Sequence, residues 1–268
     1  MSLCLSHDAG MKLIFLGSGT SSGVPVIGCR CAVCTSSDPR NQRTRPSVVV
    51  EVAGGKLLID TTPELRVQLL RERIERVDAI LFTHYHADHI FGLDDVRVLH
   101  HVIGGPMPLY ADRATLAVLR RTFSYAFDRW SDRIPGGGIP KLDLRMIDSR
   151  RAFEVLGERV TPVRLLHGRF RVLGFRIGSL AYCADVNRIP ERGMRQLEGL
   201  DVLVLDALRD RPHPTHFSVA ESLEVVRRLR PRRCFLTHIA HELDHASTNS
   251  RLPPGVELAY DGLRVECS

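Results

Sequence analysis

The stretch Thr83-His84-Tyr85-His86-Ala87-Asp88-His89 places four candidate metal ligands within six residues. It directly follows the apolar run Ala79-Ile80-Leu81-Phe82, which predicts a buried β-strand that delivers the histidines. Imidazole nitrogens and carboxylate oxygens are the ligands that hold a divalent metal with an open position for water. One loop cannot complete two such sites, so we expect further ligands from later parts of the chain.

The rest of the chain reads as a mixture of strands and helices around this stretch. A short strand is predicted at 12–16, and a β-hairpin with a Gly-Gly turn at 47–60. Helices and strands follow one another without regular βαβ units, which favours an α/β (α+β) fold of two packed sheets with helices outside. We expect residues 11–268 to form one domain and residues 1–10 to be a loose N-terminal extension.

Local composition predicts two helix starts and one irregular loop. Thr62 followed by Pro63 is typical of an N-cap and a first helical position. Ser218 with Glu221 three residues later predicts a capping box at the start of another helix. Residues 128–140 contain three consecutive glycines and two prolines, so they are expected to form a mobile loop or lid.

Composition limits the classes of protein to which this chain can belong. Of its 268 residues, 44% are hydrophobic and 25% are charged, which is ordinary for a globular protein. No apolar run approaches the roughly 18–20 residues that span a membrane, and the N-terminus does not resemble a secretory signal. The net charge is +6, from 37 Lys and Arg against 31 Asp and Glu. We interpret this largely arginine excess as too small and too dispersed to predict nucleic-acid binding.

The cysteines point to a metal site. There are seven, an odd number, which favours metal binding in a reducing cytoplasm over a disulfide framework. Three of them lie in Gly28-Cys29-Arg30-Cys31-Ala32-Val33-Cys34, where their spacing lets three thiolates grip one ion within a tight turn. Tetrahedral zinc takes four nitrogen or sulfur ligands, so a fourth must come from elsewhere in the chain.

The histidine stretch resembles the motif of the metallo-β-lactamase superfamily. The likeness runs along nearly the whole chain, from Phe15-Leu16-Gly17-Ser18-Gly19-Thr20 to Tyr260-Asp261-Gly262. More narrowly, two segments resemble the phosphodiesterases of phosphonate degradation, the carbon–phosphorus lyase pathway. They are the Gly-x-Pro-x-x-Gly-Cys-x-Cys-x-x-Cys run at 23–34 and Leu236-Thr237-His238-Ile239-Ala240-His241. This resemblance implies a four-layer αββα sandwich, a di-metal centre and a structural zinc ion.

The resemblance also implies which residues hold the metals. The first ion would take three histidines, His84, His86 and His167. The second ion would take Asp88, His89 and His238, and Asp185 would bridge the two ions. The structural zinc would take Cys29, Cys31, Cys34 and His241, with His245 and Cys4 as competing candidates for the fourth ligand.

Other residues are matched to supporting roles. His216 corresponds to the histidine that is proposed in the family to protonate the leaving group, and His213 is the local alternative. Asp60, at the end of its predicted strand, resembles the aspartate that orients the metal loop. Asp88 is expected to contribute to catalysis as well as to metal binding.

The function implied by the resemblance is hydrolysis of a small phosphodiester, cyclic ones included, by water that two Mn²⁺ or Zn²⁺ ions activate. Three alternatives stay open: a tRNA 3′-end-processing endonuclease, a single-iron dioxygenase, and a non-hydrolytic accessory protein of pyrroloquinoline quinone biosynthesis. The first would carry an additional substrate-gripping arm, and the second would not need the second set of ligands. We expect a cytoplasmic enzyme, homodimeric as in the family, without membrane or nucleic-acid partners.

Overall fold

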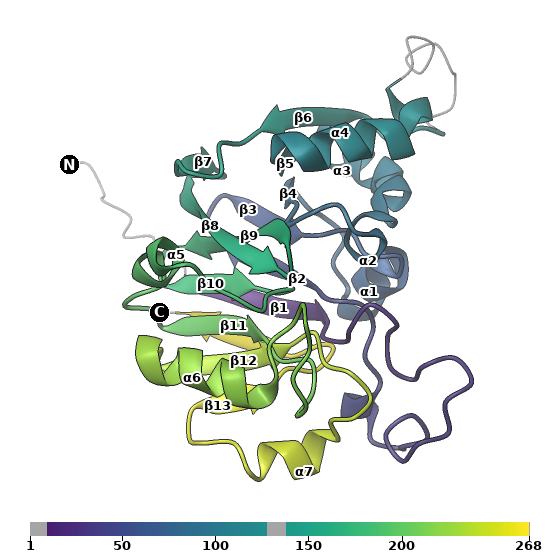
Figure 1. The fold of residues 1–268 in the computed structure, drawn as a ribbon. Helices are drawn as coiled ribbons and strands as arrows, with labels where there is room; N and C mark the ends of the chain where they lie inside the picture. The colour runs from purple at the N-terminus through teal and green to yellow at the C-terminus, as the bar shows by residue number, and fades with distance from the viewer. Residues whose placement is uncertain (1–9, 128–137, 268) are drawn as a thin grey trace, which may run out of the picture.

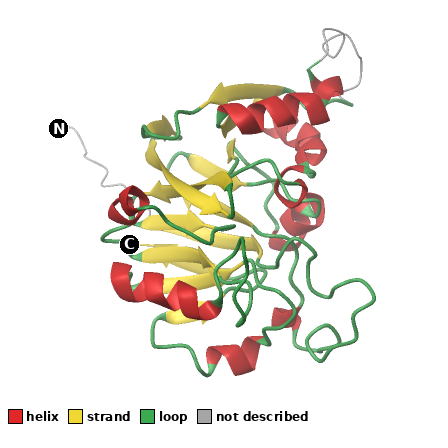
Figure 2. Cartoon of the chain, viewed as in Figure 1, coloured by secondary structure: helices red, strands yellow, loops and turns green. Residues whose placement is uncertain are grey.

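A computed structural model describes residues 10–127 and 138–267 of the chain. Almost all of the predicted N-terminal extension and most of the predicted lid at 128–140 lie outside the described residues. Within the described residues, two seven-stranded sheets face one another, and helices cover both outer sides (Figures 1 and 2). The predicted α/β sandwich with four layers is therefore confirmed.

The first sheet combines the N-terminal half of the chain with its last strand. Its strands are β1 (Met11–Gly17), β2 (Ser47–Val52), β3 (Gly55–Ile59), β4 (Ala79–Leu81), β5 (Met107–Ala111), β6 (Leu142–Met146) and β14 (Arg264–Cys267). Their order is β14-β1-β2-β3-β4-β5-β6, antiparallel from β14 to β3 and parallel from β3 to β6. The hairpin predicted at 47–60 is the antiparallel pair of β2 and β3.

The second sheet is built from the C-terminal half of the chain. Its strands are β7 (Phe153–Val155), β8 (Glu158–His167), β9 (Phe170–Ile177), β10 (Leu180–Cys183), β11 (Val202–Asp206), β12 (Arg233–Thr237) and β13 (Val256–Leu258). Their order is β13-β12-β11-β10-β9-β8-β7. Neighbouring strands from β10 to β13 are parallel, and those from β7 to β10 are antiparallel. The residues that follow the parallel strands β10 and β12 therefore lie at the same edge of the sheet.

Helices pack on the outer faces of both sheets (Figure 1). They are α1 (Leu65–Glu72), α2 (Ala87–Ile90), α3 (Leu99–Ile103) and α4 (Arg113–Thr122) beside the first sheet, and α5 (Glu191–Gln196), α6 (Val219–Leu229) and α7 (His245–Asn249) in the second half. Short 3₁₀ helices span Pro39–Asn41, Leu93–Val98 and Ser124–Ala126. No helix in the described part of the chain is both long and apolar enough to cross a membrane.

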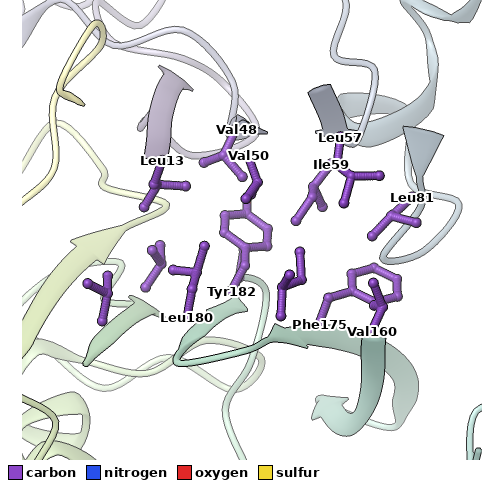
Figure 3. Packing of buried hydrophobic residues seen from close by; sticks show 14 of the residues in the cluster. Leu13, Val48, Val50, Leu57, Ile59, Leu81, Val160, Phe175, Leu180 and Tyr182 are labelled. Atoms are coloured by element: carbon purple, nitrogen blue, oxygen red, sulfur yellow. The ribbon is translucent and has the colours of Figure 1, made fainter. Parts of the chain in front are cut away.

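Apolar side chains fill three layers. Between the sheets, Leu13 of β1 and Val50 of β2 meet Phe175 of β9 and Tyr182 of β10 (Figure 3). Successive residues of a strand point to opposite faces, so Ile14 packs in a separate apolar layer beneath the helices of the first sheet. A third layer lies between the second sheet and its helices. Both sheets are therefore buried on both faces, which holds their strand ends in fixed relative positions.

The two predicted helix starts have different outcomes. Ser218 caps α6 as predicted, because the carboxylate of Glu221 accepts the N–H of Ser218 at 2.7 Å and the Ser218 hydroxyl accepts the N–H of Glu221. The predicted cap at Thr62 is wrong, since α1 begins three residues further along the chain without a side-chain cap. The Thr62 hydroxyl instead donates to Oε1 of Gln68 at 2.9 Å.

The glycine-rich loop after β1 packs on the segment that follows β12. Gly17 leaves no room for a side chain, because a Cβ there would lie 1.9 Å from the carbonyl oxygen of Arg45. The N–H of Thr20 donates to the carbonyl of Ile239 at 3.0 Å, and the N–H of Ile239 donates to the carbonyl of Ser18 at 2.9 Å. The loop thus joins the first sheet to the end of β12 in the second.

Candidate metal centre

The predicted ligands of the di-metal centre lie where strands of the two sheets end. The histidine stretch 84–89 follows β4 of the first sheet and continues into α2. In the second sheet, His167 is the last residue of β8, Asp185 comes two residues after β10, and His238 directly follows β12. These strand ends meet at one edge of the sandwich, so residues far apart in the sequence become neighbours.

The four residues predicted around the second ion form one tight cluster. Ligand atoms of Asp88, His89, Asp185 and His238 all lie within 4.8 Å of one another. Nε2 of His89 is 3.0 Å from Oδ2 of Asp185 and 3.4 Å from Oδ2 of Asp88. Nε2 of His238 is 3.3 Å from the other oxygen of Asp185. The Asp185 carboxylate thus presents one oxygen to each imidazole.

The three histidines predicted around the first ion also lie together. The ring centres of His84 and His86 are 4.4 Å apart, and those of His86 and His167 are 5.4 Å apart. His167 and Asp185 further belong to a group whose ligand atoms lie within 4.8 Å of one another, with His216 as its third member. Asp185 therefore lies close to both predicted sets, through His167 of the first and through His89 and His238 of the second. His84 and His86 belong to none of the compact ligand groups found among the described residues.

Several buried polar atoms of this centre have no hydrogen-bond partner among the described residues. They are Nε2 of His84 and of His238, together with Nε2 of His89 and Oδ2 of Asp185, which lie 3.0 Å apart but without hydrogen-bond geometry. Buried polar groups are nearly always paired, and leaving one unpaired costs about 1–3 kcal/mol. Nitrogen and oxygen atoms that converge without hydrogen bonds are a suitable donor set for a divalent metal. The residues present therefore fit metal binding.

Burial favours neutral imidazoles at three of the candidate ligands. It lowers the pKa of His84 and of His167, and it lowers the pKa of His238 to about 3. A neutral imidazole offers a nitrogen lone pair, which is the form that binds a metal. Burial alone would also lower the pKa of His89, but three surrounding carboxylates outweigh it and hold that pKa well above its usual value.

Asp60 lies behind the histidine stretch and fixes its orientation. Its Oδ2 is 2.7 Å from Nδ1 of His89. The same carboxylate accepts the N–H and the hydroxyl of Thr83, each at 2.8 Å. With Nδ1 of His89 engaged by Asp60, Nε2 of the same ring faces Asp185. A carboxylate behind a histidine in this way sets both the tautomer and the ring orientation.

Three strand-ending residues of the centre adopt the left-handed backbone conformation. Asp60, Asp185 and His238 have φ angles of 65°, 54° and 59°. This conformation costs a non-glycine residue about 1–3 kcal/mol, and it persists where the surrounding structure enforces it. All three side chains are buried at the point where their strands end, so the turn aims each of them into the centre.

His216 lies against both ligand sets. Its ring centre is 4.5 Å from that of His167, and it stacks on His238 at 4.4 Å. Nδ1 of His216 is 2.7 Å from Oδ2 of Asp206, a buried carboxylate at the end of β11. Burial alone would lower the pKa of His216, but Asp206 outweighs it and raises that pKa above its usual value. The pair can therefore hold a proton beside the centre.

Asp206 is a residue of the site that sequence reasoning did not identify. Burial raises its pKa to about 7. The available signal was its position, because it ends an apolar strand just as Asp60 and Asp185 follow theirs. His213, the alternative proton donor, lies further out, with its ring centre 5.2 Å from that of His216. It belongs to none of the groups in the described chain that could hold a metal.

The cysteine run forms a second cluster with His241. Nδ1 of His241 lies 3.3, 3.4 and 3.6 Å from the sulfur atoms of Cys29, Cys31 and Cys34, respectively. The N–H of Cys34 donates to the sulfur of Cys31 at 3.4 Å and contributes to lowering the pKa of Cys31 to about 6. Three sulfur atoms and one nitrogen in a compact group are the donor set of a tetrahedral zinc site.

The structure separates His241 from its competitors for this cluster. Nε2 of His245 lies 3.0 Å from the side-chain amide nitrogen of Asn249, outside the group of sulfur atoms. Cys4 lies outside the described residues. Since His238 belongs to the cluster of Asp88, His89 and Asp185, and His241 to the cysteine cluster, one short segment connects both groups.

Comparisons with known proteins agree with this geometry. Residues 56–239 match the family model of the beta-lactamase superfamily domain. A crystal structure of a new diphosphatase from the PhnP family is 45% identical, with a TM-score of 0.89, and covers 96% of this chain and 98% of that one. Zn²⁺-bound PqqB from Methylobacterium extorquens has a TM-score of 0.72 at 22% identity, over 95% of this chain and 99% of its own, which shows the shared fold.

A longer relative gives a match along most of this chain. The octanoyltransferase of Porphyromonas gingivalis is 35% identical over 260 residues, which are 95% of this chain and 51% of that protein. The chain thus spans about half the length of this curated relative. Because the family model matches more than half of its residues, the chain belongs to the metallo-β-lactamase superfamily, and it is similar along nearly its whole length to a diphosphatase of the PhnP family.

Proposed function

We propose that this protein hydrolyses phosphodiesters at a centre of two divalent metal ions. The observation that carries the proposal is that ligand atoms of Asp185 lie within 4.8 Å of those of His167 from one set and of His89 and His238 from the other, with buried unpaired ligand atoms in both sets. Mixed nitrogen and oxygen ligands suit Mn²⁺ as well as Zn²⁺. The two ions would share Asp185 and take the remaining ligands in two sets, His84, His86 and His167 for one, and Asp88, His89 and His238 for the other.

Contacts within the chain orient the proposed ligands before any metal or substrate binds. Two divalent ions bound here would neutralise charge on the phosphate oxygens and lower the pKa of a bound water. The carbonyl of Thr215 accepts Nδ1–H of His167 at 2.8 Å, so this ring is fixed in the same manner as His89. The Asp88 side chain is 12% exposed against 3% for Asp185, so Asp88 is the carboxylate that substrate and water can reach.

Phosphorus as the reacting atom is supported by the similarity to the PhnP-family diphosphatase, which is 45% identical to this chain. In a diphosphate and in a phosphodiester alike, water attacks a phosphorus atom that carries a leaving oxygen. The same ligands and the same proton donor therefore serve both reactions. A phosphodiester is the substrate class that the resemblance in the sequence implies, and we keep it as the proposed one.

His216 is the proposed donor of a proton to the leaving oxygen. Asp206 occupies Nδ1 of this ring at 2.7 Å, which leaves Nε2 to carry the proton that is transferred. The ring lies against His167 and His238, so it borders both proposed ions. An imidazole beside a carboxylate is suited to general acid catalysis near neutral pH.

We further propose that Cys29, Cys31, Cys34 and His241 hold a structural zinc ion. The four ligand atoms lie within 4.8 Å of one another, and the set leaves no position for water in a four-coordinate site. His238 is three residues from His241, so an ion in the cysteine cluster would fix the segment that carries a ligand of the catalytic centre. The proposed zinc therefore acts on catalysis through position alone.

The phosphodiesterase proposal predicts turnover of simple diesters. Loaded with Mn²⁺, the wild type should hydrolyse bis(p-nitrophenyl) phosphate, measured as p-nitrophenolate release, and a five-membered cyclic phosphate, measured as formation of the ring-opened phosphomonoester by ³¹P NMR. His86→Ala should lower kcat/KM by at least about 100-fold, because it removes a first-ion ligand. His101→Ala, a change at an exposed histidine of α3, is the matched control and should stay within about threefold of the wild type. Wild-type turnover no higher than that of His86→Ala would contradict the proposal.

The role of His216 predicts a dependence on the leaving group. With an alkyl leaving group, which needs a proton, His216→Ala should lower kcat by about 10²–10⁴-fold. With p-nitrophenolate, which departs without one, the loss should be much smaller. Kinetics of both substrates with both His216→Ala and His213→Ala decide between the two candidate donors. An equal loss of kcat on both substrates would assign His216 a structural role instead.

Asp60→Asn is expected to weaken metal binding at the catalytic centre by about 10–100-fold, because the amide no longer fixes His89 as the carboxylate does. Metal content measured by mass spectrometry after dialysis against a competing chelator checks this. Asp143→Asn, a change at a surface carboxylate paired with Arg145, is the control. Metal retention equal to that of the wild type would show that Asp60 does not support the ligand.

Cys31→Ser should lower bound zinc by about one equivalent and reduce the free energy of unfolding, since a structural zinc site contributes directly to folding. Zinc content and urea denaturation are the measurements. Cys267→Ser provides the control, because Cys267 is a buried cysteine outside the cluster. The free energy of unfolding of Cys267→Ser should fall, and its zinc content should equal that of the wild type. Unchanged zinc in Cys31→Ser would disprove the structural site.

A further inference from the structure

The positive charge of this chain is concentrated in one segment. Residues 150–195 contain ten arginines and no lysine, against four acidic residues, a balance of +6. The whole chain also has a net charge of +6. The charges of the remaining residues therefore balance, and the positive excess belongs to this segment, in which β8, β9 and α5 carry two arginines each.

Arginines elsewhere in the fold are mostly paired with carboxylates. Examples are Arg145, whose guanidinium lies 2.8 Å from Asp143, and Arg251, which lies 2.7 Å from Asp210. Paired charges of this kind leave little net potential at the surface.

Three arginines of the basic segment lack such partners. Arg164, Arg171 and Arg192 have no carboxylate within 4.0 Å among the residues that the structure describes, and the nearby Glu191 is paired with Arg228. Arg192 donates to the backbone carbonyl of Arg150 at 3.1 Å. Their positive charge is therefore not neutralised by the described part of the chain.

These three arginines line one cavity. Its volume is about 290 Å³, and it lies between the edge of β8 and the start of α5, which are adjacent in Figure 1. In the β8–β9 register, Arg164 opposes Leu173 and Arg171 opposes Leu166, so the two arginines are diagonal neighbours on one face of the hairpin. The cavity lining includes Arg164, Arg171, Arg192, Ser149, Leu166 and Pro190.

The lining suits an anion with several oxygen atoms. Like charges at neighbouring cross-strand positions repel one another, so bringing guanidinium groups together without a counter-ion is unfavourable. A guanidinium group donates two parallel hydrogen bonds to a phosphate, which makes arginine the residue suited to such anions. The apolar wall of Leu166 and Pro190 gives the organic part of a phosphate ester a surface to pack against.

The cavity lies on the hairpin that also supplies the metal centre. Arg164 precedes His167 by three residues of β8, which is about 10 Å along an extended strand. Phe170, which opposes His167 across the hairpin, has its ring centre 5.7 Å from that of His86. Because Arg164 and His167 are three residues apart, their side chains leave opposite faces of β8. The cavity therefore lies at the same end of the hairpin as the metal centre, and its lining includes none of the predicted metal ligands.

We propose that the cavity of Arg164, Arg171 and Arg192 binds a phosphate group other than the one that is hydrolysed. The phosphate group that binds there is either a second phosphate on the substrate or free phosphate from solution. The first source rests on the proposed phosphodiesterase function, whereas the binding of phosphate to the cavity does not.

Binding is tested with inorganic phosphate as the probe. Equilibrium dialysis of the metal-loaded protein against radiolabelled phosphate should detect binding at the metal centre and at the cavity. The variant Arg164→Gln/Arg171→Gln should lose about one equivalent of bound phosphate, or bind it about tenfold more weakly. Arg227→Gln/Arg251→Gln removes the same charge from arginines that are paired with Glu224 and Asp210, and should bind as the wild type does.

Kinetics separate the two sources. Both double variants should hydrolyse bis(p-nitrophenyl) phosphate, which has no second phosphate, as the wild type does. A raised KM of Arg164→Gln/Arg171→Gln for a diester that also carries a phosphate monoester supports the substrate as source, and an unchanged KM with lost phosphate binding supports free phosphate. Wild-type phosphate binding by this variant, or equal losses in both variants, would overturn the site. Absence of any diester turnover would refute the phosphodiesterase but leave the dialysis result decisive for the cavity.

Discussion

The approach of His89 to Asp185 joins the two sheets at their functional edge. Nε2 of the imidazole lies 3.0 Å from a carboxylate oxygen that follows a strand of the opposite sheet. The imidazole is fixed from behind by Asp60, and the sheets are held apart at a constant distance by Phe175 and Tyr182 (Figure 3). A change in the packing of the inter-sheet core would therefore alter the distance between ligands of different sheets.

Several features of the centre raise the free energy of the metal-free fold, and metal binding would offset this cost. Asp60, Asp185 and His238 adopt left-handed backbone conformations, and several nitrogen and oxygen atoms are buried without hydrogen-bond partners. Each of these features costs on the order of 1–3 kcal/mol, and they lie within one small region. Two ions at this place would satisfy the unpaired atoms, so metal binding and folding are expected to be thermodynamically linked.

A second set of contacts makes the metal-bearing segments rigid. The segment after β12 carries His238 and His241 and pairs through Ile239 with the glycine-rich loop of the first sheet. Asp261 accepts hydrogen bonds from Ser18 and Thr44 and thereby fixes that loop. The proposed zinc ion would add a further link between these segments. This explains why a four-coordinate structural site would lie so close to the proposed catalytic centre.

The sequence by itself determined the features that are local. These are the candidate ligands in the stretch 84–89, the cysteine spacing in 29–34 and the capping box at Ser218. Each is contained in one short segment, whose backbone geometry follows from spacing. The helix start predicted at Thr62 is wrong because the Thr62 hydroxyl donates to Gln68 instead of capping the helix. Only the tertiary structure decided that Asp206 supports His216 and that the arginines of β8, β9 and α5 share a cavity. These contacts join residues whose strands meet through sheet register and core packing, which no local spacing encodes.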